Sequence, residues 1–266
     1  MIRTGILYCA LGLLLAACPG SQGSADRGTP AAAAGVDDSI YRAARDNPAR
    51  SAGDRERDAG RHPAEILRFF GIRPGMTVLD LFSGGGYYTE MLAHVVGSNG
   101  RVVAHSNSAY ARFAGDETAV RYADERLPNV SILMAENNQL DLPPATFDAI
   151  LMILAYHDIY FVSPNDGWPR IDGAKLLAEL YEGAKPGAVL GIVDHYAAAG
   201  APRETGGTTH RIDPGIVIAE VEAAGFKLDG KSEVLRNMDD DYSKSVFDDA
   251  LRGHTDRFVL RFVKPE

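Results

Sequence analysis

Hydrophobic positions along the chain alternate between a strand period and a helix period. The clearest change of period lies in residues 76–96, MTVLDLFSGGGYYTEMLAHVV, where an apolar run at 76–82 precedes apolar positions three and four residues apart at 86–96. The same patterns predict further strands at 101–105, 130–134, 147–155 and 188–194, and further helices at 63–70, 116–126, 171–183 and 214–224. Strands that alternate with helices require a parallel sheet covered by helices on both faces. The chain is therefore predicted to form one α/β domain.

Three consecutive glycines join the first of these strands to its helix. Gly84, Gly85 and Gly86 allow a sharp turn and the close approach of a ligand, and the free N–H groups of the helix start favour an anionic group. A dinucleotide site would show GxGxxG, and a phosphate-binding loop would show GxxxxGK[ST]; the chain has neither spacing nor the lysine. With Asp80 at the end of the strand, the loop predicts a nucleoside site of a third kind.

Asp80 followed by Gly84 and Gly86 resembles motif I, [D/E]xGxGxG, of the class I S-adenosylmethionine-dependent methyltransferases, with Phe82 in place of the first glycine. Further matches to that superfamily follow in order over about residues 60–264: Glu136 after the third strand, Phe147-Asp148-Ala149, and Lys185-Pro186-Gly187. A closer resemblance is to a bacterial subfamily of exported predicted methyltransferases of unestablished substrate, through GGGYYTE, YHDIY, HRID, LRN and RGHTDRFVLRF.

This resemblance implies a Rossmann-like fold with a mostly parallel seven-stranded sheet, helices on both faces and a C-terminal antiparallel hairpin near 226–236 and 256–263. It also implies S-adenosylmethionine as cofactor, with its methionine end at the motif I loop and its adenine amine at Glu136. The acid that holds the ribose in the family has no counterpart after the second strand, where Asn107 offers a neutral partner instead. The implied cofactor-binding residues are Asp80, Phe82, Ser83, Gly84, Gly85, Gly86, Asn107, Glu136 and Asn137.

Polar residues also follow the fourth and fifth strands, at the edge where open α/β sheets bind ligands. These residues are Tyr156-His157-Asp158, Asp194-His195 and, in the next loop, His210-Arg211-Ile212-Asp213. The catalytic candidates are therefore His157, Asp158, Asp194, His195 and His210. His157 is the predicted base that removes the acceptor proton, with Asp158 or Asp194 orienting its ring.

Histidine and aspartate also form metal sites, so a mixed site of Asp158, Asp194, His195 and His210 is the second role open to this group. Their spacing matches no recognised metal signature, so no metal site is assigned from the sequence. Two further functions stay open: an exported ligand-binding lipoprotein with a repurposed methyltransferase fold, and a metal-assisted enzyme that uses these histidines.

Charge narrows the class of methyl acceptor. The 266-residue chain has a formal net charge of −9, and no cluster of lysine and arginine interleaves with aromatic residues. A nucleic-acid acceptor is therefore disfavoured, and a small-molecule or envelope-associated acceptor is predicted. The oligomeric state cannot be predicted from these patterns.

The first residues indicate export. Arg3 precedes an apolar stretch at 6–15, and Leu15-Ala16-Ala17-Cys18 resembles a bacterial lipobox. Residues 1–17 are predicted to be a lipoprotein signal peptide, Cys18 the lipidated residue, 18–38 a flexible tether, and 39–266 the methyltransferase-like domain with an N-terminal helical segment. Pro19 is not the aspartate that retains such proteins at the inner membrane, so the periplasmic face of the outer membrane is the predicted location. The charged segment 39–61 is interpreted as a solvated helix, or alternatively as a lid over the ligand.

Overall fold

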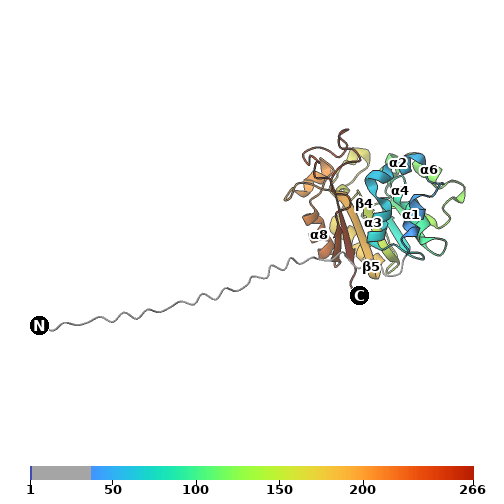
Figure 1. Cartoon of the computed structure of the whole chain (residues 1–266), viewed down its shortest axis with the longest axis horizontal. Coiled ribbons are helices and arrows are strands. Elements are labelled where there is room, and N and C mark those ends of the chain that lie inside the picture. The colour runs from blue at the N-terminus through green and yellow to red at the C-terminus, as the bar shows by residue number, and fades with distance from the viewer. Residues whose placement is uncertain (2–36) are drawn as a thin grey trace.

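A seven-stranded sheet crosses the domain in the computed structural model, which describes Met1 and residues 37–266 (Figure 1). The strands are β1 Thr77–Leu81, β2 Arg101–Ser106, β3 Val130–Met134, β4 Phe147–Ile153, β5 Ala184–His195, β6 Lys227–Ser232 and β7 Arg257–Val263. The α-helices are α1 Ser39–Arg45, α2 Ala52–Arg61, α3 Pro63–Phe70, α4 Tyr87–Val96, α5 Ser108–Ala114, α6 Glu117–Arg121, α7 Gly173–Gly183 and α8 Pro214–Ala223. Four short 3₁₀ helices of the described chain join them: η1 Ala123–Glu125, η2 His157–Ile159, η3 Pro164–Asp166 and η4 Arg203–Gly207.

The strands lie in the order β3-β2-β1-β4-β5-β7-β6. Strands β1 to β5 pair in parallel, and β7 is antiparallel to both of its neighbours, β5 and β6. The predicted mostly parallel sheet with a C-terminal antiparallel hairpin is confirmed. Strands β2 and β3 are added on one side of β1, and β4 and β5 on its other side. At this change in strand order the carboxyl ends of β1 and β4 form a crevice where a ligand can bind.

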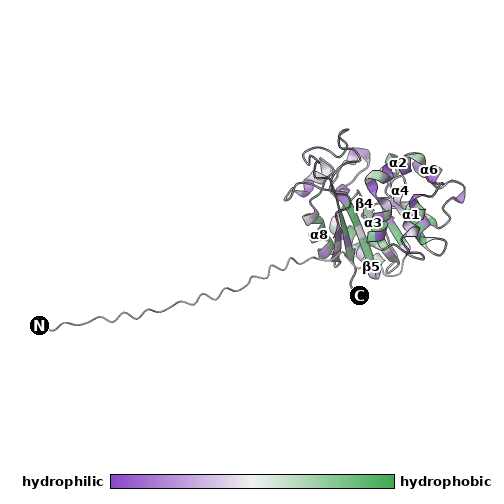
Figure 2. Cartoon of the chain, in the orientation of Figure 1, coloured by the Kyte–Doolittle hydropathy of each residue, from purple (hydrophilic) through white to green (hydrophobic). Residues whose placement is uncertain are grey.

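Alternate residues of the strands face two separate hydrophobic layers. On one face Val78 and Leu151 pack with helices α1, α3 and α4, and on the other Leu79 and Ile150 pack with α7 and α8. Figure 2 shows the apolar strands inside the domain and the hydrophilic segments along its outer helices and loops. Successive residues of a strand point to opposite faces of the sheet, so apolar residues in a row contribute to both hydrophobic cores.

The helix predicted at 116–126 is wrong in its extent. The side chain of Asn107 caps α5 by accepting a hydrogen bond from the N–H of Tyr110, and Gly115 ends this helix with a φ of 53°. Only Glu117–Arg121 then forms α6. The strand predicted at 188–194 begins earlier, at Ala184, because Ala184 pairs with Phe147 of β4.

The segment before α3 is not a solvated helix throughout. It contains α1 and α2, and the side chains of Arg50 and Asp54 within it are buried. Arg50 binds Asp58 through two hydrogen bonds of 2.7 and 2.8 Å. Among residues 37–266, no helix has the length and apolar character needed to cross a bilayer. The predicted signal peptide, Cys18 and the tether up to residue 36 lie outside the described residues.

Candidate active site

A cavity of about 1140 Å³ lies over the carboxyl ends of β1, β4 and β5. Its walls come from α2, the loop between β1 and α4, α5, the segment after β4, and the loop that leads into β7. The lid interpretation of residues 39–61 gains support, because Arg57, Gly60 and Arg61 of α2 line this cavity.

The predicted cofactor-binding residues fall into two groups. Those that line the cavity are Phe82, Ser83, Gly84 and Gly85. Those that are not part of its lining are Asp80, Gly86, Asn107, Glu136 and Asn137. The glycine loop is thus the part of the predicted nucleoside site that opens directly into the cavity.

Phe82 occupies the place of the first motif I glycine with a left-handed backbone. Its φ is 57°, a region that costs a side-chain-bearing residue free energy and that glycine enters freely. The buried ring compensates by packing among aromatic neighbours, with ring centroids 5.2 Å from Tyr110 and 6.2 Å from Trp168. Phe82 therefore adopts a backbone conformation that glycine enters freely, and its ring adds an aromatic wall to the cavity.

Residues of α6 and of the segment after it pack closely against Gly85 and Gly86. A Cβ on Gly85 would meet the carboxylate of Glu117, and a Cβ on Gly86, whose φ is 81°, would lie 2.5 Å from the hydroxyl of Tyr122. Arg121 donates a hydrogen bond to the carbonyl of Gly85. Glycine is therefore required at Gly86, by its positive φ and by this close packing, and Arg121 holds the backbone of Gly85.

Asp80 is buried at the end of β1. Its carboxylate accepts a hydrogen bond of 2.6 Å from Thr89 of α4, and no cation of the described chain pairs with it. Burial raises the pKa of Asp80 to about 7, against the smaller opposing effect of the Thr89 hydrogen bond. A positively charged ligand group beside this carboxylate would favour its ionised form.

Asn107, Glu136 and Asn137 meet at the ends of β2 and β3. The amide nitrogen of Asn107 donates to the Asn137 side-chain oxygen at 2.7 Å, and Glu136 accepts hydrogen bonds from the backbone and hydroxyl of Ser108. The amide nitrogen Nδ2 of Asn137 is buried and has no hydrogen-bond partner among the described residues. This donor is free to bind an acceptor atom of a ligand.

Four of the five predicted catalytic residues line the cavity, and the fifth lies behind them. His157, Asp158, His195 and His210 face the cavity. Asp194 is fully buried and accepts a hydrogen bond from Nδ1 of His157 at 2.8 Å and another from the His157 backbone N–H at 2.8 Å. Asp194 therefore fixes the imidazole of His157, the orienting role that the sequence left to either aspartate.

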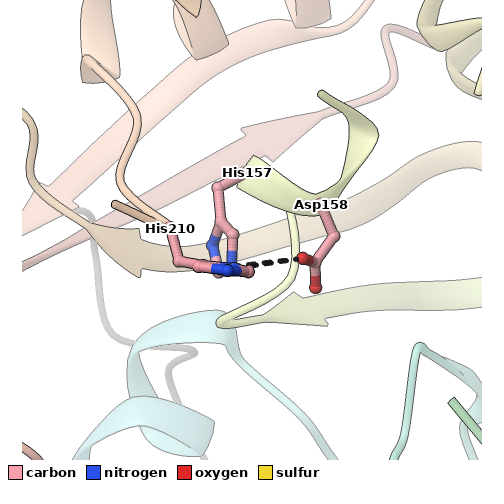
Figure 3. A group of neighbouring side chains, drawn as sticks. All are labelled: His157, Asp158 and His210. Atoms are coloured by element: carbon pink, nitrogen blue, oxygen red, sulfur yellow. Dashed lines mark ion pairs between the residues drawn. The ribbon is translucent and has the colours of Figure 1, made fainter. Parts of the chain in front are cut away.

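The side chains of His157, Asp158 and His210 point toward one another (Figure 3). Oδ1 of Asp158 lies 3.4 Å from Nε2 of His157 and 3.6 Å from Nδ1 of His210. The hydroxyl of Tyr110 donates to Oδ2 of Asp158 at 3.0 Å. The ring of His195 lies 5.8 Å from that of His157 between centroids, but its Nδ1 is 2.7 Å from the hydroxyl of Thr255.

The protonation states of His157, Asp158 and His195 follow from their burial and from their charged neighbours. Burial lowers the pKa of His157, but Asp194 and Asp158 outweigh burial and raise it to about 9. Burial likewise opposes ionisation of Asp158, whereas the charge of His157, the nearby imidazole of His210 and the hydrogen bond from Tyr110 hold its pKa below the ordinary value. His195 has its pKa well below the ordinary value, because burial and the nearby cationic side chains disfavour its charged form. The predicted base is thus an imidazolium at neutral pH in the ligand-free chain.

Several residues of the cavity wall were not predicted. Arg61 lies over the ring of Tyr87 at 4.6 Å, Tyr110 reaches Asp158, and Arg257 donates to the carbonyls of Gly60 and Gly253. The sequence signals were the charged segment before α3 and the RGHTDRF motif. Trp168 is buried and donates to the carbonyl of Asp158 at 3.3 Å, so it packs within the wall.

Comparisons with known proteins agree on one superfamily. The family model of protein-L-isoaspartate(D-aspartate) O-methyltransferase matches residues 41–160. A ubiquinone/menaquinone biosynthesis C-methyltransferase of Hydrogenovibrio crunogenus is 33% identical over 136 residues, which cover 50% of this chain and 46% of that protein. A 2-phytyl-1,4-naphtoquinone methyltransferase of Nostoc sp. is 33% identical over 132 residues, which cover 49% of this chain and 51% of that protein.

The chain thus spans about half the length of these curated relatives. Among solved structures, the crystal structure of an S-adenosylmethionine-dependent methyltransferase from Aquifex aeolicus matches with a TM-score of 0.56 and 26% identity. That match covers 86% of this chain and 98% of the other.

Proposed function

We propose, from the premise that this chain belongs to the class I S-adenosylmethionine-dependent methyltransferase superfamily, that it transfers a methyl group from S-adenosylmethionine to a small-molecule or envelope-associated acceptor. The observation that carries the proposal is the single cavity that joins the glycine loop at Phe82–Gly85 to His157 and Asp158. A methyl transfer needs the cofactor and the acceptor in one space from which water is excluded, with the reacting atoms about 3–3.5 Å apart.

Two buried groups support the fit of the cofactor. Asp80 has no cationic partner in the described chain, and S-adenosylmethionine carries positive charge at its sulfonium and amino groups. Asn137 has a buried amide nitrogen without an acceptor, and the nucleoside offers ring nitrogens and hydroxyl oxygens. The cofactor supplies an activated methyl group; Asp80 and the glycine loop would hold its methionine end, and Asn107, Glu136 and Asn137 its nucleoside.

The chain's own residues would act on the acceptor at the other end of the cavity. His157 is the acid–base candidate because the hydrogen bond from its Nδ1 to Asp194 directs Nε2 away from Asp194, on the side of Asp158 and His210. Aromatic side chains border the same space, which suits an acceptor with an apolar or aromatic part. They are Phe82, Tyr110, Phe161, Trp168 and Phe247.

Replacement of Asn137 by aspartate tests the nucleoside end. The aspartate keeps an oxygen that accepts from Asn107, but it replaces the free N–H donor by a carboxylate oxygen and adds a negative charge beside Glu136. We expect the affinity for S-adenosylhomocysteine, measured by calorimetric titration of the full chain, to fall at least tenfold, because one hydrogen bond contributes about a factor of ten and the acceptor atom of the ligand now faces a carboxylate.

Asn138→Asp is the matched control. Asn138 is the next residue along the chain and uses its side chain to bind Arg170 and Asp172 instead. Equal affinities of the wild-type chain and N137D would contradict the assigned nucleoside end. No binding by a folded wild-type chain would favour the ligand-binding lipoprotein instead.

Export and lipid attachment at Cys18 complete the proposal. They rest on the apolar stretch at 6–15 and the LAAC sequence that ends at Cys18. We expect Cys18→Ser to abolish incorporation of labelled fatty acid in the producing cell and to release the protein from the membrane fraction. Label that persists in this variant would contradict lipidation at Cys18, and Cys9→Ser serves as the control that keeps it.

A further inference from the structure

We propose that His157, Asp158 and His210 form a binding site for a divalent transition-metal ion whose remaining coordination positions open into the cavity. This site goes beyond the proposed methyl transfer and does not depend on it. The three side chains offer two imidazole nitrogens and one carboxylate oxygen, and these atoms lie within 4.8 Å of one another.

The separations of the donor atoms suit a shared metal ion better than direct hydrogen bonds. Oδ1 of Asp158 is 3.4 Å from Nε2 of His157 and 3.6 Å from Nδ1 of His210. A charged hydrogen bond between nitrogen and carboxylate oxygen spans about 2.7–2.9 Å. Two ligands of a tetrahedral zinc ion, each about 2.0–2.1 Å from the metal, lie about 3.4 Å apart. The two separations that involve Oδ1 of Asp158 are therefore close to those of ligands that share one small ion, and all three donor atoms lie within 4.8 Å of one another.

The side chains of His157 and Asp158 are each oriented by a hydrogen bond to a neighbouring residue outside the proposed ligand set. Nδ1 of His157 donates to the buried carboxylate of Asp194, which leaves Nε2 for the metal once the ion displaces the proton that Nε2 carries in the metal-free chain. Oδ2 of Asp158 accepts from the hydroxyl of Tyr110, which leaves Oδ1 for the metal. Metal-binding histidines in proteins commonly donate their second nitrogen to a carboxylate in this manner, and such outer partners fix both the tautomer and the ring.

His210 is held in place by its backbone and by aromatic rings. Its φ is 56°, an unfavourable value for a residue with a side chain, and strained residues of this kind collect at functional sites. The adjacent Arg211 is fully buried, pairs with Asp240 through two hydrogen bonds and so anchors this turn. The imidazole of His210 packs against Phe247 at 4.8 Å between ring centroids.

The donor set selects the class of ion. Two imidazoles and one carboxylate favour Zn²⁺, Fe²⁺ or a similar first-row ion, whereas Mg²⁺ prefers oxygen ligands throughout. Three protein ligands also leave at least one coordination position free, the arrangement of catalytic zinc sites as opposed to structural ones. This ligand set differs from the mixed site considered from the sequence, because Asp194 lies behind His157 and His195 is turned to Thr255.

Titration of the full metal-free chain with Zn²⁺ alone tests the site. We expect one ion per chain, with no displacement by equimolar Mg²⁺. His210→Ala is expected to weaken binding at least tenfold, and Asp194→Asn by 10- to 100-fold, the range found for outer partners of metal ligands. His254→Ala is the matched control, because His254 lines the same cavity outside the cluster, and its affinity is expected to equal that of the wild-type chain.

X-ray absorption spectroscopy of the zinc-loaded wild-type chain tests the ligand set without relying on the folding of any variant. Scattering from two imidazole rings and first-shell nitrogen and oxygen atoms at about 2.0–2.1 Å is the expected result. Absence of saturable zinc binding, full binding by H210A, equal competition by Mg²⁺, or a shell without imidazole would each overturn the proposal.

Discussion

Replacement of Arg121 by methionine is expected to lower the free energy of unfolding by about 3 kcal/mol. The guanidinium of Arg121 is buried and binds two buried carboxylates, Asp54 at 2.8 Å and Glu90. Loss of one partner of a buried ion pair costs about 3–5 kcal/mol, because the remaining charge is left without compensation. The lower end applies here since Arg57 still pairs with Asp54 and Arg126 still pairs with Glu90.

Urea unfolding at pH 7 measures this effect, with Arg45→Ala as the control. Arg45 pairs with Asp46 on the surface, and such exposed pairs contribute less than about 1 kcal/mol. A loss in R121M no larger than in R45A would contradict the buried network. Because Arg121 also donates to the carbonyl of Gly85, R121M is expected to bind S-adenosylhomocysteine more weakly than R45A does.

Replacement of Asp80 by asparagine is expected to stabilise the ligand-free chain at alkaline pH. The pKa of Asp80 is raised from 3.8 to about 7, so the folded chain retains a proton that the unfolded chain releases. A raised carboxyl pKa makes stability fall as pH rises from about 4 to about 7, and the deficit is constant above that range. A shift of this size corresponds to about 4 kcal/mol at pH 8, and this deficit is absent in D80N.

The measurement is urea unfolding of both proteins between pH 4.5 and pH 8 in the absence of ligand. We expect the two stability curves to converge toward pH 4 and to separate up to pH 7, with D80N the more stable. Parallel curves would show that Asp80 does not titrate in this range. D80N is also expected to bind S-adenosylhomocysteine at least tenfold more weakly, because the loss of a carboxylate partner to a charged amino group costs about 1.5–3 kcal/mol.

A gain in stability together with a loss of ligand affinity in D80N would show that Asp80 serves ligand binding at a cost in stability. A buried carboxylate without a cation destabilises the empty chain, and a cationic ligand removes that deficit. Arg121 differs, because two carboxylates of the chain itself, Asp54 and Glu90, compensate its charge. The two variants therefore distinguish a buried charge that is compensated only by a bound ligand, Asp80, from one that is compensated by side chains of the protein, Arg121.

Sequence periodicity was sufficient to locate the strands and most of the helices. Strand and helix periods are local properties of the chain, so the run at 76–82 and the helix of residues 86–96 could be located from apolar spacing alone. The resemblance of Asp80, Gly84 and Gly86 to motif I implied a mostly parallel seven-stranded sheet with a C-terminal antiparallel hairpin, which the structure confirms. The order of the strands within the sheet came from the structure. The division of residues 108–121 into two helices was missed, because it depends on one cap at Asn107 and one turn at Gly115.

The candidate site depended on contacts between distant segments. The sequence named the five residues of the histidine group, since the carboxyl ends of parallel strands share one edge. Only the tertiary structure decided that Asp194 binds His157 from behind, that His195 turns to Thr255, and that His210 meets Asp158. These pairings join residues 37, 60 and 52 positions apart, and they are set by loop paths and side-chain packing that no local period encodes.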